Sequence, residues 1–172
     1  MPRVTHVKKA KKDNPVCKAG ESYYWWAFRY GGKRYSLTPP KPSQLTNSPY
    51  FSGVRALIEQ IEDTTMSEPG DLEILRDEIV GEITGLGEQA QESLDNIEPE
   101  GLKEGPTGQM LQERVEACES AASELESMDM EFTSELDEDD KDITDADKEE
   151  ELDAWLMDQQ SEMAEFVGGC EV

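Results

Sequence analysis

The chain has 172 residues, of which 40 are acidic and 16 are Lys or Arg, and its net charge is −24. Only 35% of the residues are hydrophobic and 33% are charged, which excludes a large core and favours a small domain with an arm. The sequence has no apolar run of about 18 residues and no apolar signal segment, and its three distant cysteines cannot form a disulfide framework. We therefore expect a cytoplasmic protein with no membrane partner.

Charge is divided between the two ends of the chain. Residues 1–55 contain eleven Lys and Arg against two acidic residues, a net charge of +9, whereas residues 56–172 contain five basic and thirty-eight acidic residues, a net charge of −33. Nine of the twelve aromatic residues also lie in the first 51 positions. This division predicts two binding roles, or one binding role and a second segment that regulates it.

Residues 1–20 are basic and have no hydrophobic period, so we expect a flexible arm. Two aromatic-rich runs then surround Gly31 and Gly32, which predicts a β-hairpin with a two-residue type I′ turn. In that register Arg29 lies opposite Arg34. The core-like face would carry Trp26, Phe28, Tyr30, Tyr35 and Leu37, and the opposite face Tyr23, Trp25, Arg29 and Arg34.

Residues 21–66 are expected to form one module of hairpin plus helix. A proline-rich linker covers residues 38–43, and Ser48 followed by Pro49 predicts the start of a helix that ends near Asp63. Because a two-stranded hairpin is marginally stable alone, we expect this helix to cover the core-like face.

Residues 71–128 are expected to form a helical hairpin. Apolar residues recur every three or four positions from Leu72 to Ile97 and from Leu111 to Leu125, and a segment rich in Gly and Pro separates the two stretches. The pattern predicts either an antiparallel pair of helices or a coiled-coil arm that makes a homo-oligomer.

The C-terminal region is expected to be acidic and partly disordered. Residues 129–151 form a charge run that predicts a disordered linker, and residues 152–172 an acidic amphipathic helix and tail, with helical sequence from about Asp147. The predicted partner-binding side of this helix consists of Leu152, Trp155, Leu156, Met163 and Phe166. The predicted fold class is mainly α with a small N-terminal β-hairpin, an α+β protein.

The hairpin and the arm form the predicted nucleic-acid-binding site. Cations neutralise phosphates, and exposed rings stack on bases. Arg29 and Arg34 are expected to pair across the strands, where like charges repel each other, and an anion bound between them would relieve that repulsion. We assign phosphate contacts to Lys8, Lys9, Lys11, Lys12, Arg29, Lys33 and Arg34, and stacking to Tyr23 and Trp25. The alternative is a small core hairpin whose arginines are simply solvated.

We expect neither catalysis nor a cofactor. The chain has no Ser/His/Asp, Cys/His or phosphate-loop pattern. His6 and Cys17 would supply only two of the four ligands of a structural zinc site, so no metal is predicted.

The acidic region has three interpretations. It is a solvated helical spacer, a regulator that folds back and competes with nucleic acid for the basic third, or a mimic of the charge of DNA. In the third case the chain inhibits a host defence or nucleic-acid-processing protein. We expect a host or phage protein as the partner of the acidic helices.

The segments Met1–Ala10, Lys18–Trp26 and Gly31–Leu45 resemble a family of small tailed-bacteriophage proteins, over residues 1–60. Some proteins with a similar opening carry a Cys-x-x-Cys zinc finger, but only Cys17 stands in that region here. The hairpin is also similar to the arm-type DNA-binding hairpin of phage integrases. The resemblance implies a phage protein of the infected bacterial cytoplasm, with virion association left open, that contacts DNA or RNA.

These observations predict a non-enzymatic phage protein that binds nucleic acid through a basic aromatic hairpin and uses its acidic helices for regulation or partner binding. One alternative is an acidic DNA-mimic inhibitor. A second is a coiled-coil assembly protein.

Overall fold

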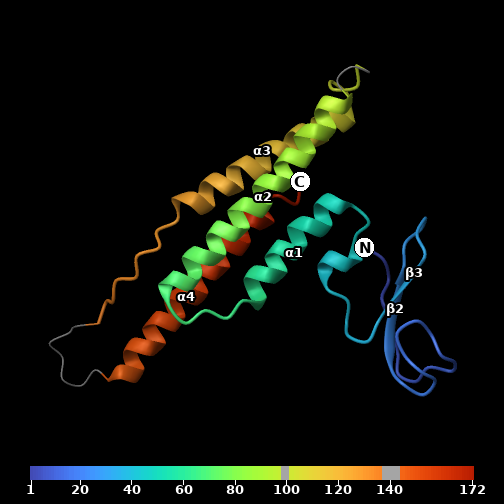
Figure 1. Ribbon diagram of the computed structural model, residues 1–172, viewed down its shortest axis with the longest axis horizontal. Coiled ribbons are helices and arrows are strands. Elements are labelled where there is room, and N and C mark those ends of the chain that lie inside the picture. The colour runs from blue at the N-terminus through green and yellow to red at the C-terminus, as the bar shows by residue number, and fades with distance from the viewer. Residues whose placement is uncertain (98–100, 137–143) are drawn as a thin grey trace. The chain divides into compact units, whose positions relative to one another are not determined.

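A computed structural model of the chain describes residues 1–97, 101–136 and 144–172. It is mainly helical with a small antiparallel sheet, which confirms the predicted α+β class (Figure 1). The chain divides into two compact units, Met1–Ala56 and Leu57–Val172. Their boundary falls inside the helix Pro49–Asp63 and not at the predicted position after residue 66. No helix in the described ranges has the length and apolarity needed to cross a bilayer.

The sheet contains a third strand that the sequence analysis did not predict. Its strands, in the order in which they pair, are β1 (Thr5–Val7), β2 (Tyr23–Ala27) and β3 (Lys33–Ser36). Central strand β2 is antiparallel to both neighbours, with Thr5 paired to Trp25 and Val7 to Tyr23. The prediction of a flexible arm is therefore wrong for β1, whose β-branched residues suit a strand once β2 offers an edge.

Hydrogen bonds also hold the connection between β1 and β2. The Ala10 N–H donates to the Glu21 carbonyl over 2.7 Å, and the Asn14 side chain accepts from the N–H groups of Val16 and Cys17 at 2.9 and 3.0 Å. Ala10 and Cys17 are buried. The lysines of this connection are thus carried by a folded loop.

The register between β2 and β3 differs from the predicted one. Tyr35 pairs with Trp25, and Arg34 pairs with Trp26 rather than with Arg29, so the pairing is shifted by three residues. Because side chains alternate between the two faces of a strand, an odd shift changes which residues of β2 share a face with those of β3.

The shift arises in the loop that joins the two strands. Neither Gly31 nor Gly32 has the positive φ that a type I′ turn requires. Instead the Gly31 N–H donates to the Phe28 carbonyl over 3.3 Å, and a Cβ at Gly31 would lie 3.3 Å from the Phe28 Cβ. The absence of a side chain at Gly31 therefore allows the backbone to approach Phe28 closely.

A short 3₁₀ helix, η1 (Pro42–Leu45), begins at the end of the predicted linker and connects the sheet to the next helix. The Gln44 carbonyl accepts a hydrogen bond from Nε1 of Trp26 over 3.2 Å. The Ser43 carbonyl accepts one from Oγ of Ser52 over 2.9 Å. These bonds connect β2, η1 and the first half of α1 within the unit Met1–Ala56.

Helix α1 (Pro49–Asp63) begins and ends where the sequence predicted. Ser48 is its N-cap, since the Ser48 Oγ accepts a hydrogen bond from the Phe51 N–H over 3.4 Å. Val54 and Ile61 of this helix are fully buried.

Helices α2 (Pro69–Ile97) and α3 (Pro106–Ser127) form the predicted antiparallel pair (Figure 1). Gly87 and Cys118 meet at their contact, and Ala121 is also buried. The remaining buried positions of the two helices are Leu72, Leu75, Ile79, Ile83, Ala90, Leu94, Gly108, Leu111, Val115 and Leu125. The apolar seam is therefore filled within one chain, which favours the antiparallel pair over a coiled coil between copies.

Helix α4 (Asp145–Gly168) packs against both α2 and α3. Its Gln160 side chain donates hydrogen bonds to the Ile61 carbonyl and, over 2.9 Å, to the Thr64 carbonyl. The predicted disordered linker of residues 129–151 is wrong from Asp145 onward, because a capping box starts the helix there. Residues 137–143 of that prediction lie outside the described residues.

Gly87→Ala and Gly81→Ala test the close contact between α2 and α3. At Gly81 the new methyl group meets open space, so we expect alanine to raise the free energy of unfolding by about 0.5–1 kcal/mol. At Gly87 the methyl would lie 3.1 Å from the Cys118 Cβ, and overpacking costs about 1–3 kcal/mol. Urea unfolding followed by circular dichroism should give a higher midpoint for Gly81→Ala and a lower one for Gly87→Ala. Equal midpoints would contradict the contact.

Asp147→Asn tests the capping box of α4. The side-chain and backbone hydrogen bonds from Thr144 hold the pKa of the Asp147 carboxyl below its usual 3.8. A lowered pKa stabilises the folded state above that value, and the contribution is lost as pH falls through the folded pKa. The variant should therefore unfold at lower urea than the unmodified chain at pH 7, with a difference that shrinks toward pH 3. Asp153→Asn, at an exposed position of the same helix, is the matched control and should leave the urea midpoint at pH 7 unchanged.

Candidate nucleic-acid interface

One face of the sheet carries three aromatic rings and a lysine. We call this set, Tyr23, Trp25, Lys33 and Tyr35, the Trp25 face. Strand alternation and pairing place the four residues on the same side. The ring centres of Tyr23 and Tyr35 lie 6.1 Å apart, and Nζ of Lys33 lies 4.8 Å from the centre of the Trp25 ring. The three rings are half-buried, so part of each contacts solvent.

The opposite side, which we call the Trp26 face, consists of His6, Tyr24, Trp26 and Arg34. Trp26 is only 2% exposed, and its indole N–H is bonded to the Gln44 carbonyl. His6 stacks on Tyr24 with ring centres 4.4 Å apart and an angle of 11° between the planes. The Trp26 face therefore provides the anchor of the sheet.

The predicted core-like face is wrong at Tyr30, Tyr35 and Leu37, whereas Trp26 is buried and Phe28 is half-buried. Tyr30 is 90% exposed and Leu37 is 58% exposed, because both lie outside the strands. Tyr35 lies on the Trp25 face through the changed register. Tyr35 was therefore not predicted as a candidate for base stacking, although it lies in the aromatic-rich run after Gly31 and Gly32.

Arg29 and Arg34 do not face each other, so the predicted anion site between them is wrong. Arg29 lies in the loop after β2, with its guanidinium carbon 5.3 Å from the centre of the Tyr30 ring. Arg34 lies in β3, where Nη2 is 3.4 Å from Oδ1 of Asn47 and the guanidinium carbon is 5.0 Å from the Phe28 ring centre. Both arginines are exposed.

Seven exposed cations of this unit form no salt bridge within the part of the chain that the structure describes. Among the described residues, no salt bridge involves any of the seven side chains assigned to phosphate contacts, which are Lys8, Lys9, Lys11, Lys12, Arg29, Lys33 and Arg34. All seven are exposed. Lys8 and Lys9 directly follow Val7, the strand partner of Tyr23, and Lys33 lies at the other end of the Trp25 face. Positive charge thus stands at both ends of the row of rings.

The predicted partner-binding side of α4 is largely internal. Leu156 is 3% exposed and Met163 is fully buried, while Trp155 contacts Phe132 with ring centres 5.4 Å apart. These residues fill the helical unit, so the prediction of a free apolar surface is wrong for Leu156 and Met163. Leu152 and Phe166 are half-buried on the same helix.

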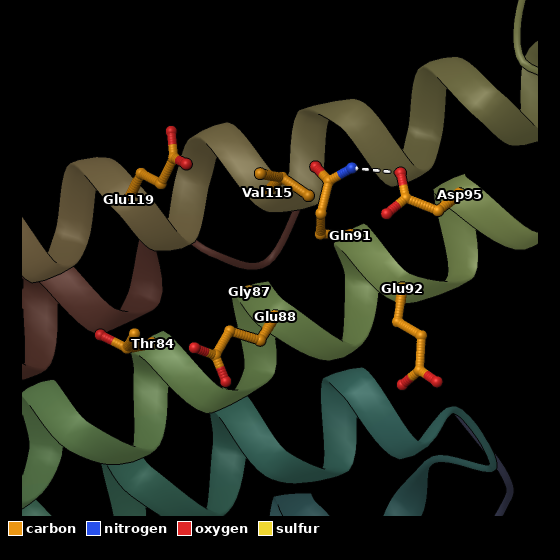
Figure 2. A pocket seen from close by; sticks show the side chains of 8 residues that line it. All are labelled: Thr84, Gly87, Glu88, Gln91, Glu92, Asp95, Val115 and Glu119. Atoms are coloured by element: carbon orange, nitrogen blue, oxygen red, sulfur yellow. Dashed lines mark hydrogen bonds between the residues drawn. The ribbon is translucent and has the colours of Figure 1, made fainter.

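An acidic groove of about 490 Å³ runs between α2 and α3 (Figure 2). Gly87 and Val115 form its buried floor, and the acidic side chains at its rim are Glu88, Glu92, Asp95 and Glu119. The Gln91 side chain donates a hydrogen bond of 2.7 Å to Asp95. The groove presents negative charge, but its acidic side chains do not form a defined ligand-binding site.

Cys118 and Cys170 are both buried where the C-terminal end of the chain meets α3. The Cys170 thiol donates to the Ala117 carbonyl over 3.4 Å. Its hydrogen bond with Cys118 and its burial raise the pKa of Cys170 far above the ordinary value, so the thiol stays protonated. Within the described ranges no three His, Cys, Asp or Glu side chains are grouped to hold a metal ion.

Comparisons with protein-family models, with curated proteins and with solved structures give no match to this chain. Its site is therefore interpreted from its own geometry.

Trp26→Ala and Tyr30→Ala test the register that defines the two faces. The observed register buries Trp26, so its truncation should cost about 3–5 kcal/mol and abolish the near-ultraviolet circular dichroism of the N-terminal aromatics. Tyr30 is exposed, and its truncation should change stability by less than about 0.5 kcal/mol. The two-residue turn would place both rings on one core-like face, and equal losses would support that register instead.

Proposed function

We propose that the unit Met1–Ala56 binds nucleic acid and that the chain acts by binding rather than by catalysis. The observation that carries the proposal is the row of partly accessible rings with unpaired cations at both ends, the Trp25 face and the lysines that follow β1. Lysine and arginine side chains release counterions when they neutralise phosphates. Aromatic rings beside these cations can stack on bases, a contact that a simple anion cannot make.

The charge of the unit is the second support. Eleven basic and two acidic residues give a net charge of +9 on 56 residues, and the four lysines at positions 8–12 lie close together in a folded loop. Like charges held close together raise the free energy of the folded unit. A polyanion relieves this repulsion, so it binds the folded unit in preference to the unfolded chain.

The acidic-decoy alternative has support in the helical unit. Glu88, Glu92 and Asp95 follow one another along α2, and Glu119 of α3 lies across the groove from them (Figure 2). Such a row of carboxylates matches a basic surface on a partner protein. In this alternative the cations of Met1–Ala56 have no nucleic-acid role.

Fluorescence anisotropy of the full chain with labelled DNA of about 20 nucleotides, from roughly 50 to 200 mM salt, tests the proposal. Affinity should fall steeply with salt. Lys8→Gln with Lys9→Gln should make the slope of log affinity against log salt shallower by about 1.4 for single strands and 1.8 for duplex, as expected for two lost phosphate contacts.

Lys103→Gln with Lys148→Gln is the matched control, because it removes the same charge from the helical unit. This control should leave the slope within error of the unmodified chain. Equal effects of the two double variants would show that only net charge matters. No binding at the lowest salt would reject the proposal and favour the acidic-decoy alternative.

A further inference from the structure

Resting on the proposed function, we infer that the ligand is a single strand of DNA or RNA whose unpaired bases stack on the Trp25 face. The inference starts from the third strand. Because β1 pairs with β2, the rings of Tyr23 and Trp25 project from the central strand of a sheet and not from a two-stranded ribbon.

The width of the sheet favours a single strand over a duplex as the ligand. The major groove of duplex DNA is about 12 Å wide and accepts a helix or a two-stranded ribbon. Three strands spaced about 4.8 Å apart span about 10 Å from one outer strand to the other, so their backbones alone occupy most of that width. The rings on β2 would then be held away from the edges of the bases. The flat faces of the bases, on which a ring could stack, are hidden inside a duplex.

Unpaired bases expose their flat faces, and aromatic side chains on a sheet surface are a recurrent platform for them. The Trp25 face has this form. Its rings are half-buried, which fixes their position while part of each remains accessible.

The polar atoms of the three rings are also available. Among the described residues, the Trp25 indole N–H and the hydroxyl groups of Tyr23 and Tyr35 have no hydrogen-bond partner in the chain, whereas the Trp26 indole is bonded to Gln44. The two adjacent tryptophans thus differ in function: one anchors the sheet and the other faces the ligand.

The cations fit a strand that crosses the sheet. Nζ of Lys33 lies 4.8 Å from the Trp25 ring centre, so a phosphate held by Lys33 would bring its own nucleotide beside that ring. Lys8 and Lys9 stand at the opposite end, next to the pair formed by Val7 and Tyr23. A backbone held at both ends would lay its bases over the rings between them.

The test measures the affinity of the full chain, at low salt, for oligo-dT, oligo-rU and a DNA duplex of equal length. Both single strands, or one of them, should bind at least about tenfold more tightly than the duplex, and the two arms decide between DNA and RNA. Duplex bound as tightly as or more tightly than both single strands overturns the inference and leaves the proposed function standing. Binding to none of the three probes rejects the proposed function itself.

Variants identify the stacking ring independently. Trp25→Leu keeps apolar bulk but removes the flat ring, and it should weaken single-strand binding by roughly 5- to 150-fold while duplex binding changes less than twofold. Trp25→Phe should restore most of the affinity, and Tyr30→Leu, at an exposed ring of the adjacent loop, is the matched control without effect. A Trp25→Leu chain that keeps its circular dichroism and binds single strands normally overturns the inference. If that variant unfolds, the ratio of single-strand to duplex affinity of the unmodified chain decides alone.

Discussion

Burial of Trp26 determines which side chains the N-terminal sheet presents to solvent. The indole ring is 2% exposed and its N–H is bonded to the Gln44 carbonyl, so the Trp26 side chain points into the interior of its unit. Since successive residues of a strand point to opposite sides, Tyr23 and Trp25 must point the other way. Pairing with β3 adds Tyr35 and Lys33 to them. One buried hydrogen-bonded ring thus sets the composition of the whole candidate site.

Fixed position is also what makes the cations useful. The hydrogen bonds of Ala10 and Asn14 fold the loop after β1, so its lysines need less ordering when a ligand binds than those of a free arm would. The cost is repulsion between neighbouring ammonium groups that no carboxylate in the described chain relieves by a salt bridge. A unit that keeps such charges unpaired is less stable alone than with an anion, and this preference is the basis of binding by linkage.

The sequence predicts the helices better than the sheet, and the reason is physical. A spacing of three and four residues over six or more turns specifies one face of α2, and the buried residues follow it except near Leu86, where Gly87 is buried instead. Strand β1 spans only Thr5–Val7, too short for a reliable period, and lysines on its C-terminal side resemble a solvated arm. The hairpin register depends on φ at Gly31 and Gly32, which glycine leaves open to either sign. The Thr144 capping box was legible and marked the true start of α4.

The candidate site was only partly predictable for the same reasons. Composition drew attention to the segment that contains Tyr23, Trp25 and Lys33. Because composition does not assign faces, Tyr35 was missed and Arg29 was wrongly paired with Arg34. The apolar side of α4 shows a related limit. A stripe such as Leu156 and Met163 specifies that a helix buries one side, but not whether its own chain or a partner covers it.

Two electrostatic ranges must be distinguished if a chain with a net charge of −24 is to bind a polyanion, as we propose. Exposed charges separated by more than about 8 Å are largely screened at physiological salt, so the acidic unit opposes approach mainly at low ionic strength. Phosphate contacts act within hydrogen-bond distance and depend on the local cations of Met1–Ala56. The salt dependence of binding therefore counts contacts at the sheet, whereas the rate of association reflects the field of the whole chain. Stacking on uncharged rings is less sensitive to salt than either, so the part of the affinity that survives at high salt reports on the Trp25 face.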